Sequence, residues 1–326
     1  MGFVLALLVA MAPPSVDALV ETLTRPGAEH AEKWQAAQAL GLAGPAAVAP
    51  LIRALDAEPS RYYAARALGM LGRTAAPAAV SRLGRVLADR TFAPRRYAAQ
   101  ALGLLGDDAA TTALEPALGD LEAVRLDALR ALMRLPGPRS RAALLRHFVP
   151  REPGALRLTV RVEGAGTVAP GGRLAVVVEL ENTGNVALVL PAPGEVLAAG
   201  WLIETADGRV VAGDPVEKED RHLLAPIPAL RLEPGGRHVL RRALSVVRWD
   251  GGERYGDELR PAPPTLALRD GGRLWAVRQG GRMTLRACWL PERAADLLTA
   301  VNPVPGGYAA PDRGSASPPV PVVLVE

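Results

Sequence analysis

Histidine and cysteine, the side chains that most often ligate transition metals or act as nucleophiles, are scarce in this chain of 326 residues. None of the four histidines (His30, His147, His222 and His238) is paired with another at the spacing of helical metal ligands. Cys288 is the only cysteine, which excludes an intrachain disulfide and a zinc or iron–sulfur centre with several thiolates. The sequence also lacks a His-Glu-x-x-His motif, a Gly-x-Ser-x-Gly motif and a phosphate loop. We therefore expect a protein that is not an enzyme and holds no metal or cofactor.

Three weaker candidates for ligand chemistry lie in the second half of the chain. An acidic cluster with the oxygen donors that Ca²⁺ prefers consists of Asp214, Glu217, Glu219 and Asp220. Lys218 and Arg221 are interleaved with it and favour a solvated loop instead. The segment Trp249–Tyr255 suits a binding loop or a plain turn. Cys288 alternates like a strand residue and is expected to be a buried small hydrophobe rather than a nucleophile.

The first half of the chain repeats one motif, Ala-Ala-x-Ala-Leu-Gly. Its copies are Ala36–Gly41, Ala64–Gly69, Ala98–Gly103 and a degenerate fourth, Ala128–Met133. Successive copies are roughly 30 residues apart, which is the length of one helical hairpin. Alanine and leucine at i, i+3 and i+4 predict helices with one apolar face, and glycine or proline follows each helix. Because a single hairpin cannot bury its apolar face alone, we expect the hairpins to stack into an α-solenoid.

At the residues AAxALGxLG the chain resembles the short HEAT-like repeats of the phycobilisome-lyase type. The resemblance covers roughly Pro14 to Phe148. It implies a HEAT-like α-solenoid over residues 13–149 and says almost nothing about activity.

A basic residue stands three positions before each Ala-Ala pair. These residues are Lys33, Arg61, Arg95 and Arg125. They form either a ladder that holds an acidic partner or a set of structural ion pairs, because an aspartate precedes three of them, namely Asp56, Asp89 and Asp120. In the family that the repeats resemble, such Asp and Arg residues tie one repeat to the next. We favour the structural interpretation.

The neighbouring repeat position varies and is the better candidate for binding. It holds Gln35, Tyr63, Tyr97 and Asp127, and tyrosines on an exposed surface are typical contact residues. Together with the variable residue inside two of the motifs, we predict a binding set of Gln35, Tyr63, Arg66, Tyr97 and Gln100. At least one of the two tyrosines is expected to pack in the core instead.

The apolar period changes from about 3.6 to 2 after Pro150, which indicates strands. Residues 150–154 are expected to be a linker, and residues 155–326 an antiparallel β-sandwich with glycine-rich turns. The stretch Leu174–Leu190 resembles the strand–Asn-Thr-Gly–strand passage of bacterial immunoglobulin-like domains, although the antibody-type disulfide is missing. The predicted fold class is therefore multidomain, α and then β. Most of the four tryptophans in this half should lie in the core.

The amino terminus allows two interpretations. Phe3–Ala12 is an apolar stretch that is too short to span a bilayer and suits the hydrophobic part of a signal peptide. No basic residue precedes it, and Pro13 would follow the cleavage point. Residues 1–12 are thus a signal peptide, which predicts a periplasmic or secreted protein, or the first repeat helix, which predicts a cytoplasmic one.

The net charge of +4 lies entirely in the first half of the chain, where residues 1–150 hold the excess of basic side chains. Only Lys33 and Lys218 are lysines, and we see no dense basic run that would track phosphates. The sequence therefore predicts a protein partner, no nucleic acid and no integral membrane segment. We expect a non-enzymatic interaction scaffold of the bacterial cell envelope that binds through the solenoid surface. The alternatives are an enzyme accessory or lyase-like subunit that cradles a cofactor or a modified protein, and nucleic-acid binding by the basic first half.

Overall fold

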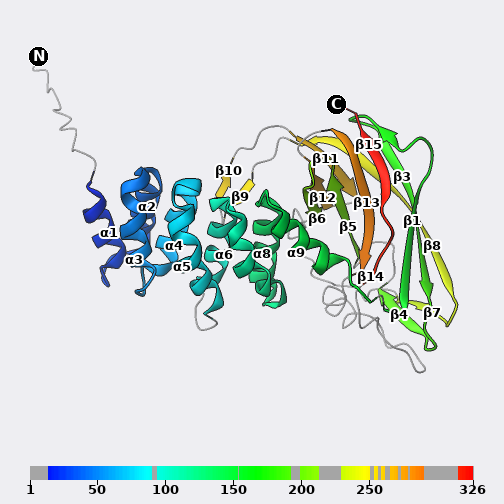
Figure 1. The fold of residues 1–326 in the computed structure, drawn as a ribbon, viewed down its shortest axis with the longest axis horizontal. Coiled ribbons are helices and arrows are strands. Elements are labelled where there is room, and N and C mark those ends of the chain that lie inside the picture. Colours follow the sequence, from blue (N-terminus) through cyan, green and yellow to red (C-terminus); the bar gives the residue numbers. More distant parts are fainter. Residues whose placement is uncertain are drawn as a thin grey trace, which may run out of the picture. The chain divides into compact units, whose positions relative to one another are not determined.

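The computed structural model describes residues 14–89, 94–152, 154–191, 199–212, 229–249, 253–255, 258–260, 265–270, 273–277, 280–289 and 315–325. They belong to two compact units, Met1–Ala131 and Leu132–Glu326. Helices come first in the chain and strands follow, as the colours of Figure 1 show. A helical N-terminal region followed by a β-rich C-terminal part is the architecture that the sequence predicts at this coarse level.

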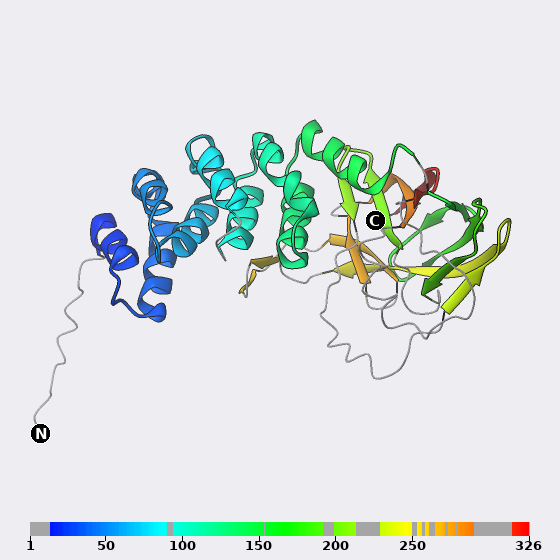
Figure 2. The ribbon, with the colours of Figure 1, turned by 90° about the horizontal axis from the view of Figure 1, so that it is seen from below.

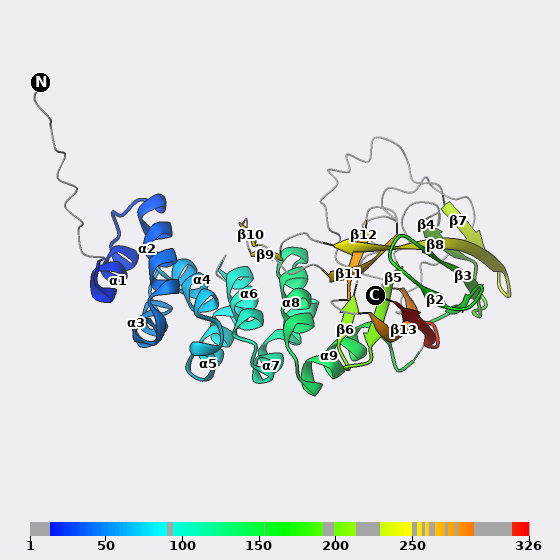
Figure 3. The ribbon, with the colours of Figure 1, turned by 90° about the horizontal axis from the view of Figure 1, so that it is seen from above.

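The helices of the described residues are short and lie in two rows. Their bounds are α1 Val16–Thr24, α2 His30–Leu42, α3 Val48–Ala54, α4 Arg61–Leu71, α5 Ala76–Ala88, α6 Arg95–Leu105, α7 Thr111–Leu114, α8 Glu122–Arg134 and α9 Pro138–Phe148. In Figure 3, α2, α4 and α6 form one row and α3, α5 and α7 form the other. Figure 2 shows the same blue-to-cyan helices side by side in sequence order.

The repeated motif builds the core of the helical array. Its alanines and leucines are buried in every copy, for example Ala64, Ala65 and Leu68 in α4. Small side chains also bring the helices close together, because a Cβ atom added at Gly103 of α6 would lie 2.6 Å from the Cα atom of Ala131 in α8. Gly72 and Gly106 end α4 and α6 with positive φ angles of 57° and 67°. The predicted stack of helical pairs is therefore confirmed.

Two larger sheets and two short ribbons make up the described part of the β region. The strands are β1 Leu156–Val162, β2 Thr167–Val168, β3 Arg173–Asn182, β4 Leu188–Pro191, β5 Ala199–Thr205, β6 Val210–Ala212, β7 Ala229–Leu232, β8 Arg237–Trp249, β9 Glu253–Tyr255, β10 Glu258–Arg260, β11 Thr265–Asp270, β12 Arg273–Ala276, β13 Gly281–Trp289, β14 Ser315–Ala316 and β15 Val320–Leu324. The first sheet has the order β1-β3-β8-β11-β12, and the second has the order β2-β15-β13-β5-β6 with β14 also on β13. The pairs β4–β7 and β9–β10 form the ribbons.

The two larger sheets share one hydrophobic core. Alternate residues of β1 are buried, as the period of 2 predicts, and they join residues such as Val178 of β3 and Leu285 of β13 in a single cluster. Trp201, Trp275 and Trp289 are buried in it, which confirms that most tryptophans of this half are core residues.

The strand order departs from that of an immunoglobulin domain at one edge. In the immunoglobulin order A-B-E-D, the strand beside E comes before E in the chain. Here β11 and β12 occupy that edge beside β8, and both follow β8 in the chain. The structure therefore gives a β-rich region with two sheets around one core, and the predicted immunoglobulin-like topology is not established.

The helix-to-strand change and the division into units fall at different places. The last helix, α9, ends at Phe148 and the first strand begins at Leu156, so the secondary structure changes across the predicted linker 150–154. The compact units divide earlier, between Ala131 and Leu132. The helix α9 packs against β6, and Arg141 of α9 forms an ion pair with Glu204 of β5. The last helical hairpin thus belongs partly to the β-rich unit.

Candidate binding surface on the helical array

The basic residues before each Ala-Ala pair have a structural role. Lys33 and Arg95 are buried, and Arg95 forms an ion pair with Asp120. Arg61 donates from Nε to the carbonyl oxygen of Leu55 at 2.8 Å, and its Nη1 atom lies 3.7 Å from a carboxylate oxygen of Asp89. Arg61 and Arg95 therefore each pair with the aspartate that follows them in the chain, in the next repeat, rather than with the one before them. The ion pairs tie successive repeats together.

Aromatic side chains from three successive repeats meet on the row of α2, α4 and α6. We call this set the aromatic ridge: His30, Trp34, Tyr62, Tyr63 and Tyr97. The ring centroids of Tyr62 and Tyr97 are 4.2 Å apart, and those of Trp34 and Tyr62 are 6.3 Å apart. Trp34, Tyr62 and Tyr97 are each half-buried, so part of each ring faces solvent. The ridge is a continuous strip of rings rather than a set of isolated side chains.

The ridge forms because the residue at one position of a repeat contacts the residue at the following position of the next repeat. Tyr62 stands two residues before Ala64 and meets Tyr97, which stands one residue before Ala98. In the next pair of repeats the same two positions hold Arg96 and Asp127, and the Nε atom of Arg96 donates to the Asp127 carboxylate at 2.8 Å. The same repeat geometry therefore gives a ring contact in one place and an ion pair in the other.

A buried arginine supports the ridge from one side. Arg66 is only 1% exposed, and its guanidinium carbon lies 3.7 Å from the ring centroid of Trp34, which is a cation–π distance. Burial and the hydrogen bond with Tyr97 raise the pKa of Tyr62 above its ordinary value, whereas the charge of Arg66 acts in the opposite direction. The hydroxyl group of Tyr62 therefore stays protonated and neutral.

The structure places the five predicted binding residues at different depths. Gln35 is exposed and Tyr97 is half-buried, so both face solvent. Tyr63 is buried, and its hydroxyl group lies 2.8 Å from Nδ1 of His30, which confirms that one tyrosine packs in the core. Arg66 and Gln100 are also buried, and Oε1 of Gln100 has no hydrogen-bond partner. Of the three buried residues, Arg66 packs on Trp34 and Tyr63 packs on Tyr62, so these two support rings that face solvent.

Sequence reasoning missed Trp34 and Tyr62, although a signal for them exists. Both stand two residues before an Ala-Ala pair, in consecutive repeats. When the repeats are aligned, Trp34 and Tyr62 occupy the same repeat position. The next position along the chain is the one that holds Tyr63 and Tyr97. The pattern that revealed the predicted binding column therefore also contained the other half of the ridge.

A second surface feature is a column of two exposed arginines on the other row of helices. Arg53 and Arg85 each follow a buried leucine by two residues, in α3 and α5. Two residues along a helix turn the side chain to the opposite side, so the leucine is buried and the arginine is exposed. Arg53 and Arg85 form no ion pair with any residue that the structure describes.

The positive excess of the first half of the chain is concentrated at its end. Residues 1–131 hold equal numbers of basic and acidic side chains, whereas residues 132–150 hold no acidic residue. The basic residues of this stretch are Arg134, Arg139, Arg141 and Arg146, at the end of α8 and in α9. The sequence interpretation that found no basic run overlooked this acid-free stretch.

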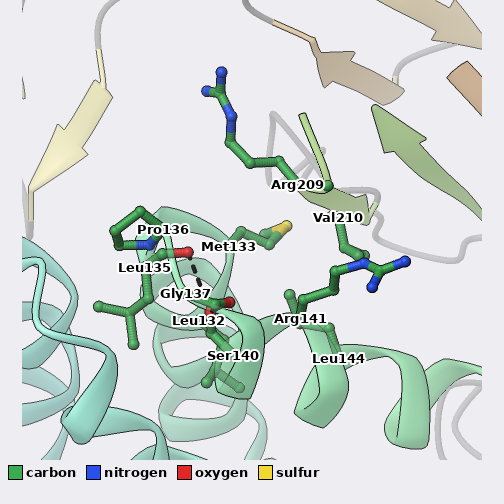
Figure 4. Close-up of a pocket in the computed structure, with 11 residues that line it drawn as sticks. Leu132, Met133, Leu135, Pro136, Gly137, Ser140, Arg141, Leu144, Arg209 and Val210 are labelled. Atoms are coloured by element: carbon green, nitrogen blue, oxygen red, sulfur yellow. Dashed lines mark hydrogen bonds between the residues drawn. The ribbon is translucent and has the colours of Figure 1, made fainter. Parts of the chain in front are cut away.

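One cavity among the described residues is small. A cavity between the end of α8, α9 and β6 has a volume of about 10 Å³, which is the space of one water molecule. Figure 4 shows Ser140 among the residues that line it, and the Oγ atom of Ser140 donates a hydrogen bond to the carbonyl oxygen of Leu135 at 3.1 Å. Within the same described ranges, no group of three or more His, Cys, Asp or Glu side chains has the arrangement of a metal site. Burial raises the pKa of the Cys288 thiol to about 12, as expected for a buried hydrophobe.

Several predictions from the sequence fall on residues outside the described ranges. These are the amino-terminal stretch Phe3–Ala12, the acidic cluster around Glu217, and the centre of the Trp249–Tyr255 segment. They stay predictions. Among the helices of the described residues, none is long and apolar enough to cross a membrane.

Comparison with known proteins identifies the repeats. Residues 48–133 match the family model of HEAT repeats, so the helical region contains HEAT repeats. No curated protein matches the chain in sequence. Among solved structures, the chain is similar to the Pseudomonas fluorescens alkylpurine DNA glycosylase AlkC bound to DNA containing an abasic site analog. The identity is 11%, the TM-score is 0.41, and the match covers 89% of this chain and 66% of that chain.

This comparison overturns three predictions from the sequence. We expected a non-enzymatic scaffold of the cell envelope, no enzymatic activity and no nucleic-acid partner. The similar structure is a DNA-bound enzyme, which contradicts all three, and we do not carry them forward. The scaffold role was inferred from the architecture, although stacked helical repeats do not determine whether a chain binds protein or nucleic acid. The other two predictions were inferred from missing catalytic motifs and from the lack of a dense basic run. A likeness of this size assigns neither DNA nor a reaction to the present chain.

Proposed function

We propose that the helical array binds nucleic acid. The observation that carries the proposal is the column of exposed arginines at one repeat position of consecutive repeats, Arg53 and Arg85. An exposed arginine donates several hydrogen bonds in a planar fork that matches the oxygens of a phosphate group. A column that recurs from repeat to repeat suits a ligand whose charges also recur along its length.

The position of these arginines alone does not explain them. Each lies in the last turn of its helix, where a cation stabilises the partial negative charge of the helix end. This stabilisation of the helix end would also be present if carboxylates lay nearby. Arg53 and Arg85 nevertheless form no ion pair with any described residue. The arginines before the Ala-Ala pairs show the contrast, since Arg61 and Arg95 are paired with aspartates. Uncompensated charge on the exposed column supports an external anionic partner.

The net charge of the helical unit does not decide whether it attracts an anionic partner. Residues 1–131 are neutral as a whole, so attraction depends on where the charges lie and not on their sum. Binding of this kind is predominantly electrostatic, and it weakens as salt is added.

The proposal is tested with the full-length chain and fluorescein-labelled DNA and RNA of about 20 nucleotides at about 0.05 M salt. Fluorescence anisotropy measures the affinity for the wild type and for the double variant Arg53→Gln/Arg85→Gln. Loss of two phosphate contacts should lower the affinity at least about 10-fold.

The matched control is Arg157→Gln/Arg161→Gln, which removes the same charge from arginines that are paired with Glu181 and Glu163. It should bind like the wild type. The absence of binding to every nucleic acid, or equal loss in the two double variants, would contradict the proposal.

We also propose that the β-rich region is a variant of the immunoglobulin-like sandwich. Three features of the strand order support it. The strands β1, β3 and β8 are adjacent in one sheet, and β15, β13 and β5 are adjacent in the other. In addition, β2 pairs with β15 in parallel. The departure lies at β11 and β12. An experimental structure in which a strand preceding β8 occupies that edge would make the domain immunoglobulin-like in full, whereas extra strands that close the sheets into a barrel would contradict the proposal.

Export stays a proposal, because the stretch Phe3–Ala12 lies outside the described residues. Cleavage after Ala12 would place the protein in the periplasm or outside the cell, where its nucleic acid would be extracellular. The mass of the mature protein tests this: loss of residues 1–12 supports export, and an intact amino terminus supports a cytoplasmic protein whose first residues form a repeat helix.

A further inference from the structure

We infer that the aromatic ridge binds unpaired bases, so that the nucleic acid taken by the array is single-stranded or locally open. The inference rests on the nucleic-acid binding proposed above and deepens it. It is carried by a different observation, the rings on α2, α4 and α6, whereas the proposed function is carried by arginines on the other row of helices.

The ridge places rings from consecutive repeats side by side. Trp34, Tyr62 and Tyr97 come from three successive repeats, and each keeps part of its ring accessible to solvent. Bases in a duplex are stacked on one another and show proteins only their edges, whereas an unpaired base can lay its face on an aromatic ring. Several rings in a row therefore favour a strand over a duplex.

The rings are also held in place before any ligand arrives. The guanidinium carbon of Arg66 lies 3.7 Å from the ring centroid of Trp34. The rings of Tyr62 and Tyr97 pack edge to face, with an angle of 73° between their planes. Tyr63 is fixed behind them by its contact with His30. Side chains that are already ordered lose little conformational entropy on binding, so more of the stacking energy appears as affinity.

The charges beside Tyr97 do not oppose a phosphate backbone. Asp127, the acidic residue at the same repeat position as Tyr97, is buried and paired with Arg96 and Arg130. Arg96 is adjacent to Tyr97 in the chain and its side chain is 44% exposed. The exposed part of the pair is therefore the cation, which suits a phosphate next to a stacked base. Of the predicted binding residues, Gln35 and Tyr97 are the ones placed to touch the ligand.

The test compares four labelled probes of one sequence and length with the full-length protein: a DNA strand, an RNA strand, the DNA duplex, and a strand in which abasic residues replace the bases. The variants are Tyr97→Ala, which removes the ring, and Tyr97→Phe, which keeps the ring and removes the hydroxyl group. We expect DNA or RNA strands to bind at least about 5-fold more tightly than the duplex and the abasic strand.

We expect Tyr97→Ala to weaken binding of the base-containing strand about 5-fold or more and to leave the abasic strand unchanged. Tyr97→Phe should bind like the wild type. Unchanged affinity for the abasic strand also shows that Tyr97→Ala has folded, and should that variant not fold, the wild-type comparison of base-containing and abasic strands decides.

The outcomes separate this inference from the proposed function. Equal binding of strand, duplex and abasic strand would overturn the inference while nucleic-acid binding stands. Binding to none of the four probes would overturn both the inference and the proposed nucleic-acid binding. The ridge would then have to bind a partner of another class.

Discussion

Burial separates the arginines of the helical array into two groups with different roles. Arg61, Arg66 and Arg95 are largely buried and contact an aspartate, an aromatic ring or a backbone carbonyl. Arg53 and Arg85 are exposed and form no ion pair among the described residues. The sequence revealed Arg61 and Arg95, because their position relative to Ala-Ala is constant, whereas it placed the buried Arg66 in the predicted binding set. It did not show which arginines are buried, since burial depends on how far each repeat rotates against the next.

The buried group makes a stability prediction. Replacing Asp120 by alanine leaves the Arg95 guanidinium group without its partner in a position that is 91% shielded, since the Arg95 side chain is 9% exposed. Breaking a buried ion pair should lower the free energy of unfolding by about 3 kcal/mol. Urea denaturation measures it.

The control for Asp120→Ala is Arg25→Ala, which breaks a pair whose side chains are 53% and 51% exposed. An exposed pair contributes at most about 1 kcal/mol. If both variants lost the same stability, the assignment of a structural role to the Arg95–Asp120 pair would be wrong.

Cys288 makes a prediction about reactivity and pH. Its pKa is about 12 in the folded chain against an ordinary value of 9.0, because burial disfavours the thiolate. Since the folded pKa is the higher one, the neutral thiol stabilises the fold fully below pH 9, and this contribution decreases as the pH rises towards 12. A disulfide reagent at pH 8 should therefore leave the folded protein unlabelled and label one thiol in denaturant. Rapid labelling of the folded chain would show that Cys288 is accessible.

At the scale of elements, the sequence predicted the helices and most of the strands well. The Ala-Ala-x-Ala-Leu-Gly motif marks α2, α4 and α6, and the alternation from Leu156 marks β1. Strand order could not be predicted, because local alternation shows which face of a strand is buried and not which strand lies beside it. The place of β11 and β12 beside β8 is such a long-range outcome.

Close packing of α6 against α8 gives a prediction for the elements themselves. A methyl group added at Gly103 would lie 2.6 Å from Cα and 2.8 Å from Cβ of Ala131, so the two helices would have to separate. We expect Gly103→Ala to lower the free energy of unfolding by about 1–3 kcal/mol, despite the higher helix propensity of alanine. Thermal and urea denaturation measure the change.

Gly27→Ala is the matched control, because nothing lies within 4 Å of the added methyl group. It should change stability by no more than about 0.5 kcal/mol. A neutral or stabilising effect of Gly103→Ala would mean that α6 and α8 are not in close contact.

At the scale of the whole molecule, the chain consists of a helical unit that contains HEAT repeats and a β-rich unit that follows it. The division between the two units falls within the last helical hairpin, between Ala131 and Leu132. The sequence predicted this order of parts but not the function, because the repeat determines a scaffold and the function depends on a few surface residues. The ridge and the exposed arginines are the surface residues that we propose for binding, and burial shows which of them face solvent.

The most direct test of nucleic-acid binding is the dependence of strand affinity on salt concentration, measured by anisotropy for the wild type, Arg53→Gln/Arg85→Gln and Arg157→Gln/Arg161→Gln. The logarithm of the binding constant should fall linearly with the logarithm of the salt concentration. Loss of two phosphate contacts should make this slope shallower by about 1.4 in the first variant, and the slope should stay unchanged in the second. Binding that does not depend on salt, or a slope that is the same in all three proteins, would contradict the account.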